Sequence, residues 1–262
     1  MASDPFSDPL NPGTMASETG KISVLLLQAR NTVDIEAQEQ ECFQERCRLD
    51  ADQITSVNLA RLDTLPDDSI LDGFDAFFIG GAGEYSATKD YPWMPFALDL
   101  VRRAHDLSLP TFGSCWGHQL IARGLGGRVE HDPDKAELGC HHVYLTVAGQ
   151  VDELFRNFPL SFLVNMGHHD RVTKLPKNGL ELVNNQSQPN EAFRIIGKPM
   201  YGTQFHSELD HRREEERLHK YRSYYENEMG SDDVFQKIID SLRETTEVDH
   251  LMYDFLCRFV SK

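Results

Sequence analysis

An almost continuously apolar run at residues 22–28, ISVLLLQ, is the feature that most restricts how this chain of 262 residues can fold. A strand with one face in water alternates apolar and polar side chains, whereas a strand covered on both faces is apolar throughout. A second run, FDAFFI at residues 74–79, leads into the glycine-rich GGAGEYS at residues 80–86. Both runs predict central strands of a sheet with helices on each face.

Helix-compatible segments separate these strands. Residues 34–47 are polar, and residues 94–107 carry apolar side chains at helical spacing. A short strand at residues 110–113 precedes a second helical stretch, HQLIARGLGG. This alternation predicts an open, mostly parallel α/β sheet, and the β-rich residues 128–206 are expected to extend or flank it.

The two ends of the chain differ from this pattern. Residues 1–20 are rich in Pro, Ser, Asp and Gly, which predicts a disordered tail. Residues 21–262 are predicted to form one domain. Within it, the charged residues 209–245 read as a helical insertion, either a solvated helical pair packed on the sheet edge or a lid or docking surface for a partner.

The charge balance excludes some partners. With 42 Asp and Glu against 26 Lys and Arg, the formal net charge is −16, which disfavours nucleic acid and anionic membranes. No apolar run approaches the roughly 20 residues needed to span a bilayer, and no secretory signal pattern opens the chain. The five cysteines form no CxxC pair and fit a reducing compartment, so we expect a cytoplasmic protein.

A candidate nucleophile lies in GSCWGHQ at residues 113–119, where a strand runs into a helix. This is the cysteine counterpart of the Gly-x-Ser-x-Gly elbow, in which glycines permit a sharp turn beneath the nucleophile. Cys115 would sit at a helix N-terminus, where the dipole and free N–H groups favour the reactive thiolate. The alternative is a buried structural cysteine.

A candidate base lies in QFHSE at residues 204–208. On an extended chain, His206 and Glu208 point to the same side, so the carboxylate can orient the imidazole and stabilise its charged form. His-x-Glu alone is a weak signal, but it becomes much stronger after a cysteine elbow in this chain order.

These motifs resemble those of the class I (triad) glutamine amidotransferases. GSCWGHQ matches the family's G-x-C-x-G-x-Q, and QFHSE matches Q-F-H-P-E with Ser207 in place of proline. GGAGEYS approximates the oxyanion loop G-G-P-x-S with one extra residue and Ala82 in place of proline. MGHHDRV at residues 166–172 approximates the substrate loop M-S-H-G-D-x-V. The resemblance implies a flavodoxin-like three-layer α/β sandwich.

The resemblance also implies a mechanism in which Cys115 attacks the γ-carboxamide of glutamine, releasing ammonia and leaving a γ-glutamyl thioester. His206 would relay protons and Glu208 would orient it, while backbone N–H groups of Gly81 and Trp116 would form the oxyanion hole. The residues implied in substrate binding are Gln119, His168, His169 and Asp170.

Several interpretations stay open. His169 replaces a family glycine, and no synthetase sequence follows, so the chain reads either as a glutaminase serving a separate synthetase subunit or as a stand-alone γ-glutamyl peptidase. A binding relative without turnover is a further alternative. We expect no cofactor and no metal, because in Cys140-His141-His142 and His168-His169 adjacent side chains on a strand point to opposite faces.

Overall fold

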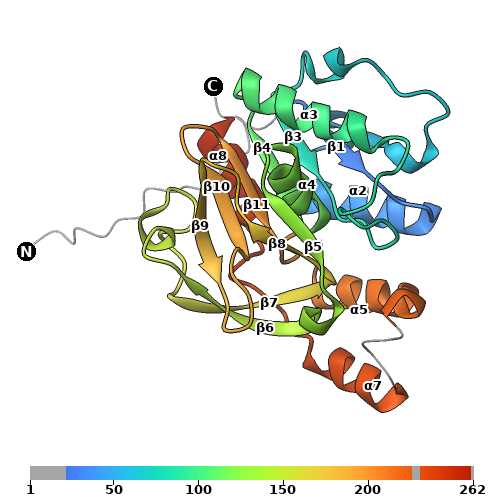
Figure 1. Ribbon diagram of the computed structural model, residues 1–262, viewed down its shortest axis with the longest axis vertical. Helices are drawn as coiled ribbons and strands as arrows, with labels where there is room; N and C mark the ends of the chain where they lie inside the picture. The colour runs from blue at the N-terminus through green and yellow to red at the C-terminus, as the bar shows by residue number, and fades with distance from the viewer. Residues whose placement is uncertain (1–21, 226–230, 261–262) are drawn as a thin grey trace, which may run out of the picture.

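The computed structural model describes residues 22–225 and 231–260. Its main sheet has nine strands in the order β2-β1-β3-β4-β11-β10-β9-β6-β7 (Figure 1). The first five are parallel to one another and the remaining pairings are antiparallel. The predicted tail at residues 1–20 lies outside the described residues.

The parallel half contains the strands predicted from the apolar runs. Its members, in spatial order, are β2 (Ile54–Asn58), β1 (Val24–Gln28), β3 (Ala76–Ile79), β4 (Thr111–Ser114) and β11 (Met200–Thr203). Every residue of the last four is buried, as expected for strands covered on both faces.

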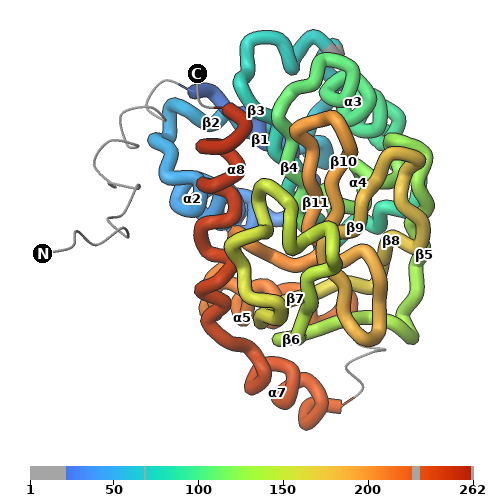
Figure 2. The backbone as a smooth tube through the Cα atoms, turned by 90° about the vertical axis from the view of Figure 1, so that its left-hand side faces the viewer, coloured from blue at the N-terminus to red at the C-terminus, as the bar shows by residue number. Residues whose placement is uncertain are grey.

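Helices cover both faces of this half and make a three-layer sandwich. The helices α2 (Val33–Cys47) and α8 (Leu251–Phe259) lie on one face, while α3 (Met94–Leu107) and α4 (Trp116–Gly124) lie on the other (Figure 2). A separate apolar cluster fills each interface, one around Phe78 and Phe255 and the other around Phe77 and Trp116. Alternate side chains of β3 thus point into different cores.

The antiparallel half extends the sheet beyond β11. It consists of β10 (Ala192–Ile195), β9 (Gly179–Asn184), β6 (Glu137–Leu145) and β7 (Ser161–His168). A separate ribbon pairs β5 (Arg128–His131) with β8 (Asp170–Lys174). Short 3-10 helices connect the elements: η2 (Ala51–Gln53), η3 (Leu59–Arg61), η4 (Asp68–Leu71), η5 (Pro133–Lys135) and η6 (Gly149–Val151).

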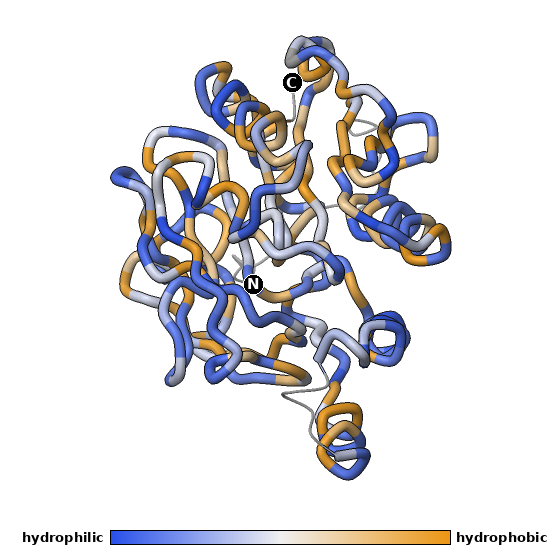
Figure 3. The backbone as a smooth tube through the Cα atoms, turned by 45° about the vertical axis from the view of Figure 1, so that its right-hand side comes forward, coloured by the Kyte–Doolittle hydropathy of each residue, from blue (hydrophilic) through white to orange (hydrophobic). Residues whose placement is uncertain are grey.

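The described part of residues 209–245 contains α5 (His211–Lys220), η7 (Arg222–Tyr225) and α7 (Asp232–Ser241). Its apolar residues join Ile35 of α2 in a third cluster. In Figure 3, α7 is the lowest helix, with a hydrophobic side toward the body of the protein. Among the described residues, no helix is both long and apolar enough to cross a membrane.

Candidate active site

Cys115 sits in a strained turn between β4 and α4, with φ 50° and ψ −98°. Arg48 and Ser108 also have positive φ, but they adopt the left-handed helical conformation common at helix ends, whereas the ψ of Cys115 lies outside that region and marks local strain. The flanking glycines make the turn feasible: a Cβ on Gly113 would lie 2.4 Å from the Gly117 carbonyl carbon, and one on Gly117 would lie 2.3 Å from the Ile79 oxygen. The elbow predicted from the sequence therefore forms.

His206 and Glu208 follow β11, the strand beside β4. His206 Nδ1 lies 2.7 Å from Glu208 Oε1, while the other carboxylate oxygen accepts a hydrogen bond from Ser114 at 2.7 Å. His206 and Cys115 line one small cavity. The structure therefore brings together the three residues predicted to be catalytic.

Burial and neighbouring charges shift the pKa values of His206 and Glu208 in opposite directions. Burial would raise the pKa of Glu208, but His206, Arg217 and Ser114 together lower it to about 2. Burial would lower the pKa of His206, but Glu208, then Glu214 and Cys115, hold it well above its ordinary value. The arrangement favours a charged imidazole beside an ionised carboxylate.

A chain of two side-chain amides reaches the thiol. Gln119 donates to the Asp170 carbonyl at 2.7 Å and to Gln204 Oε1 at 3.0 Å, and Gln204 Nε2 lies 3.6 Å from Cys115 Sγ. Gln119 was predicted as a substrate-binding residue, whereas Gln204 was not assigned a role. The QFHSE motif contains it, so its position directly before Phe205 and His206 was the available signal.

The predicted substrate loop borders a cleft of about 290 Å³ that also reaches Cys115. His168, His169 and Asp170 all line it, together with Gln119. Asp170 connects the loop to its surroundings, because its carboxylate accepts hydrogen bonds from Ser86 Oγ at 2.6 Å and the Ala87 N–H at 2.8 Å. The four residues predicted to bind substrate thus share one cleft.

The two predicted oxyanion-hole donors, the N–H groups of Trp116 and Gly81, differ in their surroundings. The Trp116 N–H lies in the first turn of α4, directly after the nucleophile. The Gly81 N–H instead donates to Glu39 Oε1 at 3.0 Å, and the Gly80 carbonyl accepts from the Gly117 N–H at 3.1 Å. Both ends of the Gly80–Gly81 peptide are therefore engaged, so in this conformation the Gly81 donor is not available to a substrate.

Glu39 belongs to a buried ionic network that the sequence analysis missed. Arg30 donates to both Glu39 oxygens, at 2.5 and 3.2 Å, and to the Tyr221 hydroxyl at 3.1 Å. Arg217 lies 4.0 Å from Glu39 and 3.4 Å from Glu208. These residues come from separate segments with no shared motif, so only the fold reveals that they connect the oxyanion loop, the triad and the C-terminal helices.

Glu137, His168 and Glu191 form a buried group whose ligand atoms, within 4.8 Å of one another, could hold a metal ion. Burial would raise the pKa of Glu137, but the ion pair with His168 lowers it to about 2, while burial and the Glu137 charge raise the pKa of Glu191 well above its ordinary value. Glu137 also accepts hydrogen bonds from Asn185 and Ser187, and His168 Nδ1 lies 3.0 Å from the Asp170 carbonyl, so the group ties the substrate loop to the neighbouring strands.

A family model for "Glutamine amidotransferase class-I" matches residues 44–222. This chain belongs to that family. The amidotransferase domain spans both the nucleophile elbow and the QFHSE strand end. The resemblance inferred from four short motifs is thereby confirmed.

The amidotransferase has curated relatives among GMP synthases. The glutamine-hydrolysing GMP synthase of Thermosipho africanus is 36% identical over 136 residues, which cover 52% of this chain and 24% of that protein. A glutamine-hydrolysing GMP synthase subunit from Sulfolobus acidocaldarius is 35% identical over 150 residues, which cover 56% of this chain and 74% of that protein. The match to the Thermosipho enzyme therefore spans about a quarter of its length.

Solved structures confirm the fold of the amidotransferase. A glutamine amidotransferase from Thermotoga maritima superposes with a TM-score of 0.68 at 20% identity, covering 92% of this chain and 99% of that one. One from Methylobacillus flagellatus gives 0.67 at 19%, covering 93% and 97%. These neighbours bear out the predicted flavodoxin-like α/β sandwich.

Proposed function

We propose that this amidotransferase hydrolyses the γ-amide of glutamine, or of a close γ-glutamyl analogue, through a thioester on Cys115. The observation that carries the proposal is the strained elbow at Cys115, beside a buried His206–Glu208 pair and at the meeting point of two cavities. A nucleophile, a base and a residue that orients the base form the minimal set for this chemistry.

In the first half-reaction, the Cys115 sulfur attacks the γ-carbonyl carbon. His206 then gives its proton to the departing nitrogen, which leaves as ammonia. Glu208 keeps the imidazole in the orientation and charge state that this step needs. The Trp116 N–H stabilises the developing oxyanion, a contribution of about 3 kcal/mol per donor in acyl transfer. A second donor from Gly81 requires the Gly80–Gly81 peptide to turn away from Glu39.

Substrate recognition is proposed for the larger cleft. Gln119, His168, His169 and Asp170 present amide, imidazole and carboxylate groups on one side of Cys115. His168 and the Asp170 carboxylate already have partners within the protein and hold the loop. His169 and Gln119 are therefore the groups proposed to contact the α-amino or α-carboxylate group of a glutamyl moiety. His169 also packs face to face on Tyr225, with ring centroids 4.4 Å apart, which gives the cleft a rigid aromatic wall.

The test is release of ammonia and glutamate from glutamine by the purified chain. Cys115→Ala should abolish both, and Cys140→Ala, at a half-buried cysteine outside the two cavities, should leave both intact. Turnover that survives in Cys115→Ala would refute the proposed nucleophile. A chain that binds glutamine without any turnover would instead favour the binding relative.

We propose a separate synthetase chain as the ammonia acceptor. The support is that similar proteins from Pyrococcus abyssi and Sulfolobus acidocaldarius carry names of glutamine-hydrolysing GMP synthase subunits, which implies that a further subunit completes each enzyme. A synthetase partner should increase glutaminase turnover when it is added. Unchanged turnover across added synthetase chains, together with strong turnover alone, would argue against this role.

The second candidate is a stand-alone γ-glutamyl peptidase, and the larger cleft favours it. At about 290 Å³ the cleft approaches the ~300 Å³ at which pockets accept drug-sized molecules. Its lining includes Tyr85, Tyr91, Tyr224 and Tyr225, which can pack on a leaving group larger than ammonia. Cys115-dependent cleavage of γ-glutamyl dipeptides with little activity on glutamine would select this candidate.

A further inference from the structure

A small cavity of about 30 Å³ meets the larger cleft at Cys115. A buried water needs a space of roughly 10–15 Å³, so the cavity accepts one or two molecules the size of water and nothing larger. Four charged side chains line this cavity but not the larger cleft: Arg30, His206, Glu214 and Arg217. Nucleophile and base therefore share a compartment sized for water.

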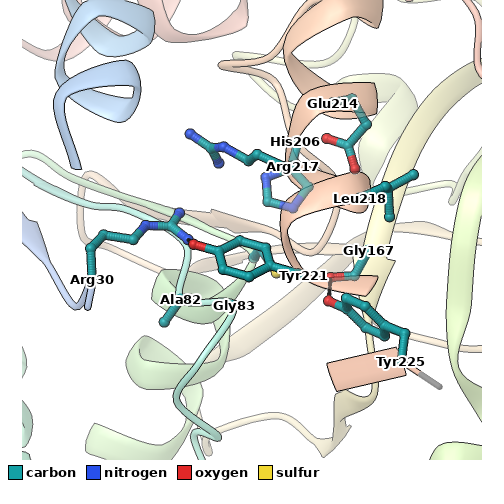
Figure 4. Close-up of a pocket in the computed structure, with 11 residues that line it drawn as sticks. Arg30, Ala82, Gly83, Gly167, His206, Glu214, Arg217, Leu218, Tyr221 and Tyr225 are labelled. Atoms are coloured by element: carbon teal, nitrogen blue, oxygen red, sulfur yellow. Dashed lines mark hydrogen bonds between the residues drawn. The ribbon is translucent and has the colours of Figure 1, made fainter. Parts of the chain in front are cut away.

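Two polar atoms of the residues that line this cavity have no hydrogen-bond partner among the described residues. They are the buried Glu214 Oε2 and Arg217 Nη2, and the two residues are only 2% and 4% exposed. Buried polar atoms left unpaired destabilise a folded protein, and an ordered water molecule is the usual partner for them. Figure 4 shows the Glu214 carboxylate beside the imidazole of His206, with Tyr221 and Tyr225 bordering the same space.

We propose that this cavity holds the water that hydrolyses the γ-glutamyl thioester, and that Glu214 positions it. The inference rests on the proposed function, since it assigns the second half-reaction of the same site. Glu214 accepts a hydrogen bond from one O–H of the water, and Arg217 donates to its oxygen. The other O–H points to His206, the residue that receives the proton.

The step balances as an ordinary thioester hydrolysis. The water oxygen forms a bond to the γ-carbonyl carbon, and its proton passes to His206. The carbon–sulfur bond then breaks, its electron pair stays on Cys115 as thiolate, and glutamate leaves. The charged imidazole and the thiolate regenerate the starting pair. Glu214 exchanges no proton in this sequence and acts as a positioning residue.

Two substitutions test the site by different means. Glu214→Leu removes the acceptor oxygens. Gly167→Ala keeps Glu214 but adds a methyl group whose carbon would lie 3.4 Å from Glu214 Oε1. Gly167 borders the larger cleft as well as the small cavity, so the KM for glutamine is measured beside the deacylation rate. Glu214→Gln is the conservative variant, because it retains one acceptor oxygen. Glu215→Gln, on the partly exposed side of α5, is the matched control.

The measurement separates the two half-reactions by rapid quench, with ammonia release reporting acylation and intact mass reporting the thioester. We expect Glu214→Leu and Gly167→Ala to slow deacylation by roughly 10- to 100-fold, so that thioester accumulates, with acylation far less affected. Glu214→Gln should recover part of the deacylation rate. Glu215→Gln should behave as the wild type.

Equal slowing of both half-reactions in Glu214→Leu would overturn the proposal, because it would show a general effect on folding or on His206. Unchanged deacylation in Gly167→Ala would also overturn it. The wild type provides the separate control: if it forms no Cys115-dependent thioester from any γ-glutamyl compound, the proposed function itself fails. If it turns over and neither variant accumulates thioester, only the water site fails.

Discussion

The parallel half of the sheet and the C-terminal segment α5–η7 both border Cys115, but different interactions hold them there. Four of the five strands of the parallel half, β1, β3, β4 and β11, are buried along their whole length and are joined by parallel pairing. The segment α5–η7 reaches the site through buried charged and phenolic side chains, with Arg217 and Tyr221 contacting Glu208 and Arg30. One region forms the frame of the site through packing, and the other closes it through ion pairs.

This difference has an energetic consequence. Apolar burial is non-directional, but the interior is close-packed, so a substitution among the packed strands acts through the volume that it adds or removes. A buried ion pair depends on geometry and on both partners, since losing one leaves an uncompensated charge. Substitutions in the two regions should therefore fail in different ways, and the following variants range from the largest expected effect to the smallest.

Gly117→Ala should have the largest effect, because the new Cβ would lie 2.3 Å from the Ile79 carbonyl oxygen in the fully buried elbow. Strand and helix would have to separate, so we expect activity to fall by at least about 100-fold and the free energy of unfolding to fall by about 3 kcal/mol. Glutaminase assays and urea unfolding measure the two. Gly126→Asn, at a positive φ with no atom near its Cβ position, should cost at most about 1 kcal/mol. Equal losses in both variants would contradict the packing argument.

Glu208→Gln tests the residue that connects the parallel half with α5. Glu208 pairs with His206 and contacts both Ser114 of β4 and Arg217 of α5. Without the carboxylate charge, His206 loses the partner that raises its pKa and fixes its orientation. We expect kcat/KM to fall by roughly 10²- to 10⁴-fold. Retention of more than about a tenth of the activity would show that Glu208 has no role in orienting the base.

Arg30→Met tests how much the buried ion pair between Arg30 and Glu39 stabilises the fold. Glu39 would be left buried and partly unpaired, which should cost about 3–5 kcal/mol of unfolding free energy. The double variant Arg30→Met with Glu39→Leu removes both charges and should recover a substantial part of this loss. A double-mutant cycle from urea unfolding gives the coupling energy, and strictly additive single effects would contradict the network.

The sequence predicted the parallel half of the sheet well, because its signals lie within short stretches of the chain. Burial on both faces gives strands a recognisable composition, and the elbow needs glycines at fixed spacing around Cys115. The triad follows because the ends of β4 and β11 are adjacent. The network of Arg30, Glu39 and Arg217 could not be predicted, since buried charges leave no periodic pattern and Arg217 reaches Glu39 from the far end of the chain, although Arg30 and Glu39 are only nine residues apart. The position of the Gly81 N–H is likewise a property of the Glu39 contact and not of the glycine motif.

Acid should weaken the fold through Glu208. Its pKa is about 2 in the folded protein and about 4.5 when the chain is unfolded, so its stabilisation is complete above pH 4.5 and is lost as pH falls toward 2. The full contribution is about 3 kcal/mol. Urea unfolding at about pH 6 and about pH 3 should show the wild type losing more stability than Glu208→Gln. An equal loss of stability in the wild type and in Glu208→Gln would show that protonation of Glu208 does not cause the weakening in acid.

Lys220→Gln gives the smallest effect and sharpens the comparison within a single helix. Lys220 of α5 pairs with Asp34 at 2.7 Å, but the two side chains are 41% and 63% exposed. Solvent screening limits such a pair to about 0.2–1 kcal/mol, although its geometry is better than that of the buried Arg217–Glu208 contact. Activity should stay at the wild-type level, because neither residue lines the cavities at Cys115.

Arg217→Gln, one helical turn earlier, should lower both stability and activity. Urea unfolding and glutaminase assays compare the two variants. Equal effects of Lys220→Gln and Arg217→Gln would show that the burial of a charged residue on α5 does not determine its contribution to stability and activity.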